Sequence, residues 1–243
     1  MMQKILMLYY PLLDSIMNHP DAVLETYEQH GCQIIEVALP CENPCFDGAV
    51  IRESMRRILE TSTIFDMFEA VRRVKEKFPY IKIQMVSYIE TIEQIGYPEF
   101  AGLCKNAYVD SLLSPDASDC QLTKLDHAFA GISKIPVIRF IPYTNNEAML
   151  EKAKHGKGYL FMQSGNSKSG EYRKIGVELK EKVAYLRKNG IDLPIIVGFG
   201  IKNGEQIKAC YQCGADGVAI GSGLLDYIAR GEIEKYLISL VSE

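Results

Sequence analysis

Short apolar runs alternate along the chain with longer amphipathic stretches. The apolar runs are rich in Ile, Val and Leu, and they are hydrophobic at nearly every position, which is typical of parallel strands covered on both faces. They predict strands at Ile5–Leu8, Gln33–Val37, Ile81–Val86, Val109–Leu113, Val137–Ile141, Gly158–Met162, Pro194–Val197 and Gly217–Ile220. The stretches between them predict helices at Asp21–His30, Ala49–Glu60, Ile64–Lys77, Glu99–Asn106, Cys120–Ala130, Ala148–Lys154, Val177–Asn189 and Gly204–Cys213.

This alternation of strand and helix predicts a parallel sheet. Eight such units in 243 residues favour an α/β fold of the (β/α)8 TIM barrel type, which has about this length. We expect a single domain over residues 1–243, because no Pro/Gly/Ser-rich linker divides the chain. An open, doubly wound parallel sheet is the alternative arrangement of these elements.

Composition excludes several classes of protein. The net charge of -4 is well mixed and no basic stripe is visible, which argues against nucleic-acid binding. No apolar run approaches about 18 residues, so we expect no membrane segment and a cytoplasmic location. Seven irregularly spaced cysteines fit a reducing compartment rather than a disulfide framework. Cys210 and Cys213 form an isolated C-x-x-C pair, and we expect no metal site there.

Two glycine clusters follow the last two predicted strands, at Gly198–Gly200 and Gly221–Gly223. In a barrel, the loops after strands seven and eight commonly form a phosphate site at the C-terminal face. Glycine lets the backbone approach an anion closely, and Ser222 adds a hydroxyl donor. We therefore expect Gly200, Gly221 and Ser222 to bind the phosphate of a small substrate. The alternative is that these glycines only form tight turns.

Two carboxylates lie in and after the second predicted strand. Glu36 is a lone acid in an apolar strand, where burial is costly unless the group is paired or functional. Asp47 ends the loop that follows. Two carboxylates at the C-terminal face of a barrel suit general acid–base chemistry. The alternatives are an ion pair inside the barrel for Glu36, and an N-cap role for Asp47 in the helix predicted from Ala49.

These residues carry a family resemblance. Residues 34–48 read I-I-E-V-A-L-P-C-E-N-P-C-F-D-G, which resembles the tryptophan synthase alpha subunit signature E-L-G-I-P-F-S-D-P-x-A-D-G-P. The V-G-F-G-I segment at 197–201 and the Gly221-Ser222 pair are similar to the phosphate loops of the same family. The resemblance implies a phosphate-binding barrel lyase of tryptophan biosynthesis. Its reaction would split indole-3-glycerol phosphate into indole and glyceraldehyde 3-phosphate by a retro-aldol step, without a cofactor.

The resemblance also implies roles for individual side chains. Glu36 would be the acid–base that protonates the indole ring carbon, and Asp47 would interact with the indole N–H. Tyr159 would be a catalytic tyrosine of the active site, and Tyr88 would be a second pocket tyrosine. Phe199 would lie over the indole ring.

The loop after the sixth strand, residues 163–170, reads Q-S-G-N-S-K-S-G and is longer than the family's S-R-x-G-V-T-G. Ser169 and Gly170 stand where the family has Thr-Gly, in a mobile lid that helps to hold phosphate. An ordinary flexible loop is the alternative.

Departures from the family pattern bear on partner and substrate. Cys41–Asn43 replaces Phe-Ser-Asp in the segment that, in the family, helps to contact a tryptophan synthase beta subunit. Docking of a beta subunit is therefore an open expectation. Two other functions also stay open. The chain could be another phosphosugar or prenyl-phosphate TIM-barrel enzyme, or a diverged non-catalytic subunit.

Overall fold

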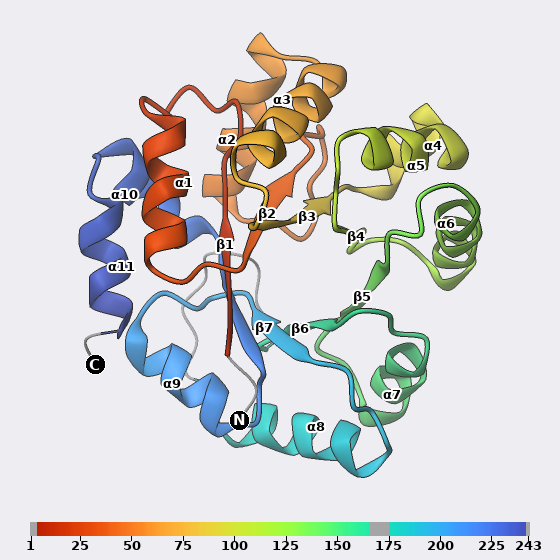
Figure 1. Ribbon diagram of the computed structural model, residues 1–243. Helices are drawn as coiled ribbons and strands as arrows, with labels where there is room; N and C mark the ends of the chain where they lie inside the picture. Colours follow the sequence, from red (N-terminus) through yellow and green to blue (C-terminus); the bar gives the residue numbers. More distant parts are fainter. Residues whose placement is uncertain (1–3, 166–174, 242–243) are drawn as a thin grey trace.

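Eight parallel strands close into a barrel in the computed structural model, which describes residues 4–165 and 175–241 (Figure 1). The strands are β1 (Ile5–Tyr9), β2 (Ile34–Ala38), β3 (Lys82–Val86), β4 (Ser111–Leu113), β5 (Val137–Ile141), β6 (Leu160–Gln163), β7 (Ile195–Gly198) and β8 (Gly217–Ile220). Each strand pairs in parallel with the next along the chain, and β8 pairs with β1. The predicted (β/α)8 barrel is confirmed, and the open-sheet alternative is wrong.

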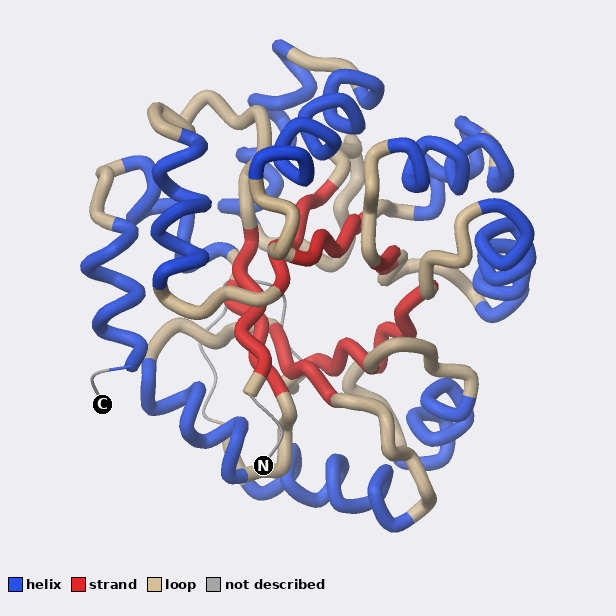
Figure 2. Tube along the Cα trace, in the orientation of Figure 1, coloured by secondary structure: helices blue, strands red, loops and turns tan. Residues whose placement is uncertain are grey.

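Helices form a layer around the strands (Figure 2). They are α1 (Pro20–Gln29), α2 (Ala49–Thr61), α3 (Ile64–Lys77), α4 (Ile89–Ile95), α5 (Tyr97–Asn106), α6 (Asp119–Ile132), α7 (Asn146–Lys154), α8 (Val177–Lys188), α9 (Gly204–Gln212), the 3₁₀ turn η1 (Ser222–Leu224), α10 (Leu225–Ala229) and α11 (Ile233–Val241). The sequence pattern did not predict α4, η1, α10 and α11, and the first three are too short to show a clear helical period. None of the helices in the described part of the chain is long and apolar enough to cross a membrane.

Individual residues at the helix ends explain where α1 and α8 end and where α2 begins. Gly31 and Gly190 have φ angles of 78° and 81° just after α1 and α8, where a left-handed residue ends a helix. The N-cap of α2 is Gly48, and no side chain bonds to the first turn of that helix. The alternative role of Asp47 as the N-cap is therefore wrong, and its carboxylate is available for other contacts.

Candidate active site

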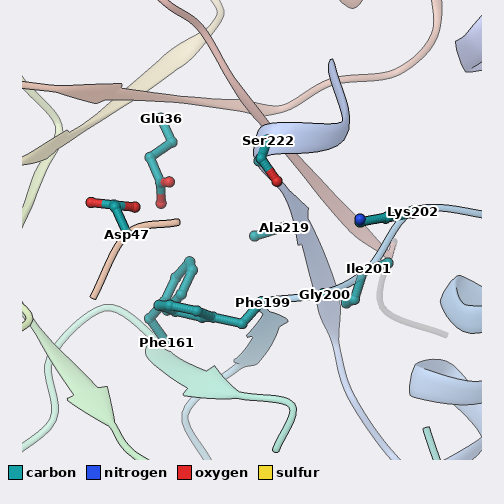
Figure 3. Close-up of a pocket in the computed structure, with 10 residues that line it drawn as sticks. Glu36, Asp47, Phe161, Phe199, Gly200, Ile201, Lys202, Ala219 and Ser222 are labelled. Carbon is teal, nitrogen blue, oxygen red and sulfur yellow. The ribbon is translucent and has the colours of Figure 1, made fainter. Parts of the chain in front are cut away.

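A pocket opens at the C-terminal ends of the strands and brings most of the predicted site residues together (Figure 3). The space open to the centre of a water molecule is about 50 Å³, and the wider hollow that includes the open mouth of the pocket is about 420 Å³. Its lining consists of Glu36, Asp47, Phe161, Phe199, Gly200, Ile201, Lys202, Ala219, Gly221 and Ser222. Of these residues, the sequence did not predict Phe161, Ile201, Lys202 and Ala219.

The turn after β7 has an unusual backbone on one side of this pocket. Phe199 has φ 69° and Gly200 has φ 74°, and phenylalanine rarely adopts this left-handed conformation. The carbonyl of Phe199 accepts a hydrogen bond from Ser164 Oγ at 2.6 Å, and that of Gly200 accepts one from Gln206 Nε2 at 3.0 Å. These two bonds hold the strained turn, and such strain is concentrated at ligand sites.

Donors for an anion gather at this side of the pocket. The backbone N–H groups of Gly200, Gly221 and Ser222 donate no hydrogen bond to any residue within 4–165 and 175–241. The Lys202 ammonium group lies at the edge of the pocket, on the side of Ser222 (Figure 3). N–H groups together with a nearby positive charge are an arrangement that can bind an anion.

Two glycines of the clusters have a packing role instead. A Cβ atom on Gly198 would lie 2.7 Å from Cζ of Phe161, and one on Gly223 would lie 3.1 Å from the Tyr236 hydroxyl oxygen. Neither glycine lines the pocket. Close packing explains these two positions, while the other clustered glycines, Gly200 and Gly221, lie at the pocket.

Glu36 projects from β2 into the pocket. Its Oε2 accepts a hydrogen bond from Gln84 Nε2 at 2.7 Å, and no Lys or Arg of the described residues forms an ion pair with it. The alternative of a barrel-interior ion pair is therefore wrong. Burial, and to a smaller extent the charge of Asp47, raise the pKa of Glu36 to about 8, although the hydrogen bond from Gln84 lowers it.

Asp47 faces the same pocket from the loop before α2. The Tyr88 hydroxyl donates a hydrogen bond to Asp47 Oδ2 at 2.8 Å and accepts one from the Phe46 N–H at 3.1 Å. Burial raises the pKa of Asp47 to about 6, against the Tyr88 bond and the charge of Arg52. Tyr88 therefore holds Asp47 in place and does not itself line the pocket.

The two carboxyl groups are prepared for different tasks. At neutral pH, a pKa of about 8 leaves Glu36 mostly protonated, and a pKa of about 6 leaves Asp47 mostly ionised. Glu36 can then donate a proton while Asp47 accepts a hydrogen bond. Paired carboxyl groups commonly take different roles in this way because their environments give them different pKa values. Across the described residues, no group of three or more His, Cys, Asp or Glu side chains is placed to hold a metal ion.

Aromatic rings form an apolar wall beside the carboxyl groups (Figure 3). The Phe199 ring packs 6.2 Å from that of Phe161 at an interplanar angle of 76°, and 5.6 Å from that of Phe140. Phe46 in turn packs against Phe140, at 5.1 Å. Such a wall suits a flat, apolar part of a ligand.

Tyr159 lies outside the pocket lining. Its hydroxyl donates a hydrogen bond to Gln84 Oε1 and lies 2.9 Å from Ser111 Oγ, so it reaches Glu36 only through Gln84. Phe161, two residues further along β6, lines the pocket instead. A catalytic role for Tyr159 stays a prediction. The predicted lid residues Ser169 and Gly170 lie outside the described residues.

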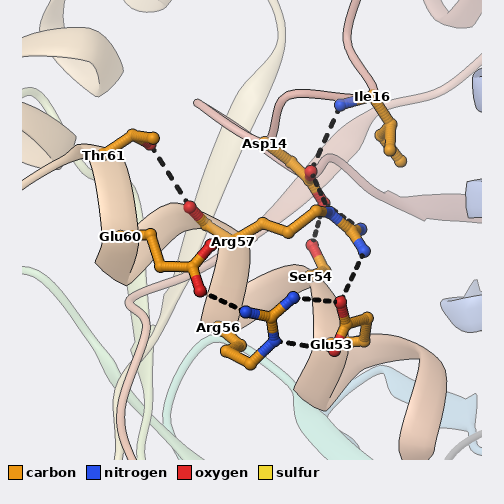
Figure 4. Close-up of polar contacts among 8 residues, drawn as sticks. All are labelled: Asp14, Ile16, Glu53, Ser54, Arg56, Arg57, Glu60 and Thr61. Atoms are coloured by element: carbon orange, nitrogen blue, oxygen red, sulfur yellow. Dashed lines mark hydrogen bonds and ion pairs between the residues drawn. The ribbon is translucent and has the colours of Figure 1, made fainter.

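A buried charge cluster anchors α2, whose first turn follows Asp47 (Figure 4). Asp14, in the loop after β1, is buried, and its Oδ1 and Oδ2 accept hydrogen bonds from Arg57 Nε and Nη2, both at 2.7 Å. Ser54 Oγ also donates to Asp14 Oδ2, at 2.5 Å. The cluster joins the loop after β1 to α2 and so fixes the helix that carries the Asp47 loop.

The sequence model of the tryptophan synthase alpha chain family matches residues 4–240. The chain belongs to the tryptophan synthase alpha chain family. A tryptophan synthase alpha chain of Staphylococcus carnosus is 28% identical over 232 residues, which cover 93% of this chain and 92% of that one. One of Lactiplantibacillus plantarum is 32% identical over 204 residues, covering 82% of this chain and 75% of the relative.

Solved structures agree on the fold. A mutant tryptophan synthase alpha-subunit of Pyrococcus furiosus superposes with a TM-score of 0.84 at 20% identity, over 100% of both chains. Mycobacterium tuberculosis tryptophan synthase gives a TM-score of 0.82 at 21% identity, over 98% of this chain and 91% of that one. The function predicted from the resemblance, a tryptophan synthase alpha-chain-like lyase of tryptophan biosynthesis, is confirmed by family membership. Its retro-aldol reaction follows from the family.

Proposed function

We propose that this chain is a carbon–carbon lyase that cleaves indole-3-glycerol phosphate with Glu36 as its acid–base. The observation that carries the proposal is that two carboxyl groups, with pKa values raised to about 8 and about 6, face one pocket that Gly200, Gly221 and Ser222 also line. In this assignment Gly200, Gly221 and Ser222 bind the phosphate. Asp47 accepts a hydrogen bond from the indole N–H.

The geometry supports a two-stage proton transfer. The anchored phosphate places the indole ring beside Phe199, between Glu36 and Asp47, which makes the reaction effectively intramolecular. Protonated Glu36 gives its proton to the ring carbon that bears the glycerol chain, and ionised Asp47 stabilises the positive charge that develops at the ring nitrogen. Glu36 then takes the proton of the adjacent hydroxyl group as the carbon–carbon bond breaks. The electron pair of that bond returns to the ring, giving indole and an aldehyde.

Lys202 adds the charge that the backbone donors lack. A phosphate monoester carries up to two negative charges near neutral pH, and neutral N–H groups alone leave them uncompensated. The ammonium group at the pocket edge, beside Ser222, supplies a positive partner. Ser169 and Gly170 would complete the site as part of a lid, as the family resemblance implies.

The partner we propose is a tryptophan synthase beta subunit. Its contact would include Cys41–Asn43, which lies between β2 and α2, beside the active-site end of the barrel, with Glu42 and Asn43 exposed. This segment differs from the family pattern, so activity is best measured both with and without a beta subunit.

The direct experiment is to measure indole release from indole-3-glycerol phosphate by the purified protein. We expect turnover by the wild type and a loss on the order of 10²-fold or more in Glu36→Gln, because the proton donor is removed. Glu25→Gln is the matched control, since Glu25 is an exposed residue of α1.

Two results would contradict the proposal. No indole with or without a beta subunit would refute it, and so would full activity in Glu36→Gln. Thermal shifts with indole-3-propanol phosphate, glycerol phosphate and prenyl phosphates then separate the alternatives, since a ligand stabilises the fold by its binding free energy. Stabilisation by a prenyl phosphate alone would indicate another phosphate enzyme. Tight binding of the indole analogue without turnover would indicate a non-catalytic subunit.

A further inference from the structure

A row of hydrogen bonds crosses the barrel interior and ends on Glu36. Gln84, on β3, is 0% exposed, and its Nε2 donates to Glu36 Oε2 at 2.7 Å. Its Oε1 accepts a hydrogen bond from the Tyr159 hydroxyl, which lies 2.9 Å from Ser111 Oγ. This polar row consists of side chains from β2, β3 and β4 and from the residue just before β6. Glu36 is the one member of the row that lines the pocket.

The row has a fixed order of donors and acceptors. A carboxamide oxygen can only accept and its nitrogen can only donate, so Tyr159 must give its single proton to Gln84 Oε1. Ser111 then donates to Tyr159. With its oxygen occupied by Tyr159, the Gln84 amide presents its nitrogen, and not its oxygen, to Glu36.

Burying the polar side chain of Gln84 in the barrel interior costs free energy unless other interactions compensate for it. A buried amide without partners is unfavourable, and the interior of a TIM barrel is ordinarily filled by branched apolar side chains. Among the described residues, the side chain of Gln84 bonds to Glu36 and Tyr159 of this row and has a 3.6 Å contact from Nε2 to Met7 Sδ in the barrel interior. Satisfying Gln84 therefore ties the Glu36 carboxyl to the barrel wall.

We propose that Gln84 is a positioning residue, which holds one oxygen of the Glu36 carboxyl from β3 while the group faces the pocket, and that Tyr159 fixes the orientation of the Gln84 amide. This inference rests on the proposed role of Glu36 as the acid–base. It also changes the role of Tyr159, from a residue that touches substrate to one that acts through Gln84.

The row has an electrostatic consequence for Glu36. Within residues 4–165 and 175–241, the titratable groups that face Glu36 are Asp47, Tyr9 and Tyr159, and none of them carries a positive charge. Burial and Asp47 both favour the protonated form, and the Gln84 N–H is the group that favours the ionised form. Gln84 thus keeps Glu36 able to take back the proton that it gives.

The test is the pH profile of kcat/KM for Gln84→Met and Tyr159→Phe. Loss of the N–H donor in Gln84→Met is expected to move the basic limb upward by about one pH unit. Tyr159→Phe frees the amide to turn its oxygen toward Glu36, so the same limb moves in the same direction. We expect kcat to fall about 10-fold with KM within about twofold, because neither residue lines the pocket.

Tyr97→Phe is the matched control. The Tyr97 hydroxyl bonds to Glu93 on the exposed surface of α4 and α5, so its removal should leave the profile unchanged. A merely structural role for Gln84 would lower stability in Gln84→Met and leave the basic limb of the profile in place. An active wild type whose profile coincides with those of both interior variants would overturn the inference and leave the proposed function standing.

A second measurement distinguishes a failure of the proposed function from a failure of the positioning role. If the wild type releases no indole, the proposed function fails, and the pH dependence of urea unfolding then reports proton binding by Glu36 without substrate. In the wild type, we expect the free energy of unfolding to fall as pH rises towards the pKa of Glu36. In Gln84→Met and Tyr159→Phe, we expect this fall to continue to a higher pH. Identical slopes in all the proteins would overturn the positioning role.

Discussion

Replacing Glu36 should stabilise the fold while it removes the activity. The pKa of Glu36 rises from 4.5 to about 8 on folding, so between these values the folded chain keeps a proton that the unfolded chain loses. Stability rises with pH only where the unfolded state binds more protons, and here it binds fewer. Glu36 therefore costs the wild type stability as pH rises through this window, and Glu36→Gln is free of the cost.

The magnitude follows from the size of the shift. At about 1.36 kcal/mol per pKa unit, the free energy of unfolding lost through Glu36 between pH 5 and pH 8 is on the order of 3 kcal/mol. The introduced amide keeps an oxygen that can accept the hydrogen bond from Gln84. We expect the advantage of Glu36→Gln to grow from about 1 kcal/mol at pH 5 to about 4 kcal/mol at pH 8.

Urea unfolding at pH 5, 6, 7 and 8 measures this difference, with Glu25→Gln as the exposed control. Asp47 titrates in the same pH range, and because it is present in all three proteins it largely cancels from the comparison. The reasoning is refuted if the stabilities of wild type and Glu36→Gln run parallel over the four pH values, or if Glu36→Gln is the less stable protein at pH 8.

Two further changes test the other side chains of the site. Asp47→Asn should lower kcat/KM about 10-fold or more and remove the acidic limb near pH 6 from its pH profile, because the ionised carboxylate is lost; a profile that keeps this limb would contradict the assignment. Lys202→Gln should raise KM for indole-3-glycerol phosphate about 10-fold with kcat within about twofold, since it removes a charge from the phosphate end. An unchanged KM in steady-state kinetics would show that Lys202 does not bind the phosphate.

Much of the fold could be predicted because barrel strands are buried on both faces. Runs such as Val137–Ile141 therefore show as unbroken apolar segments, and glycines such as Gly31 mark helix ends. Glu36 could be found for the same reason, since one acid in an apolar strand is conspicuous. Gln84 broke an apolar run in the same way, but its partners lie far away in sequence, at Glu36 and Tyr159, and only the closed barrel brings them together.

The position of a side chain along the barrel axis is harder to predict from sequence than the face of the strand on which it lies. Tyr159 and Phe161 are two residues apart, so an extended chain places them on the same face, about 7 Å apart along the strand direction. The sequence pattern could not decide which of them reaches the mouth of the barrel. The structure places Phe161 in the pocket and Tyr159 beside Gln84. Lys202 was missed because a single half-buried lysine in a loop carries no pattern of its own.

A crystal structure with indole-3-propanol phosphate tests the central claim most directly, because this analogue lacks the hydroxyl group that cleavage requires. The account predicts phosphate oxygens about 3 Å from the N–H groups of Gly200, Gly221 and Ser222, with the indole ring between Glu36 and Asp47. A phosphate bound elsewhere, or a ring that contacts neither carboxyl group, would contradict it.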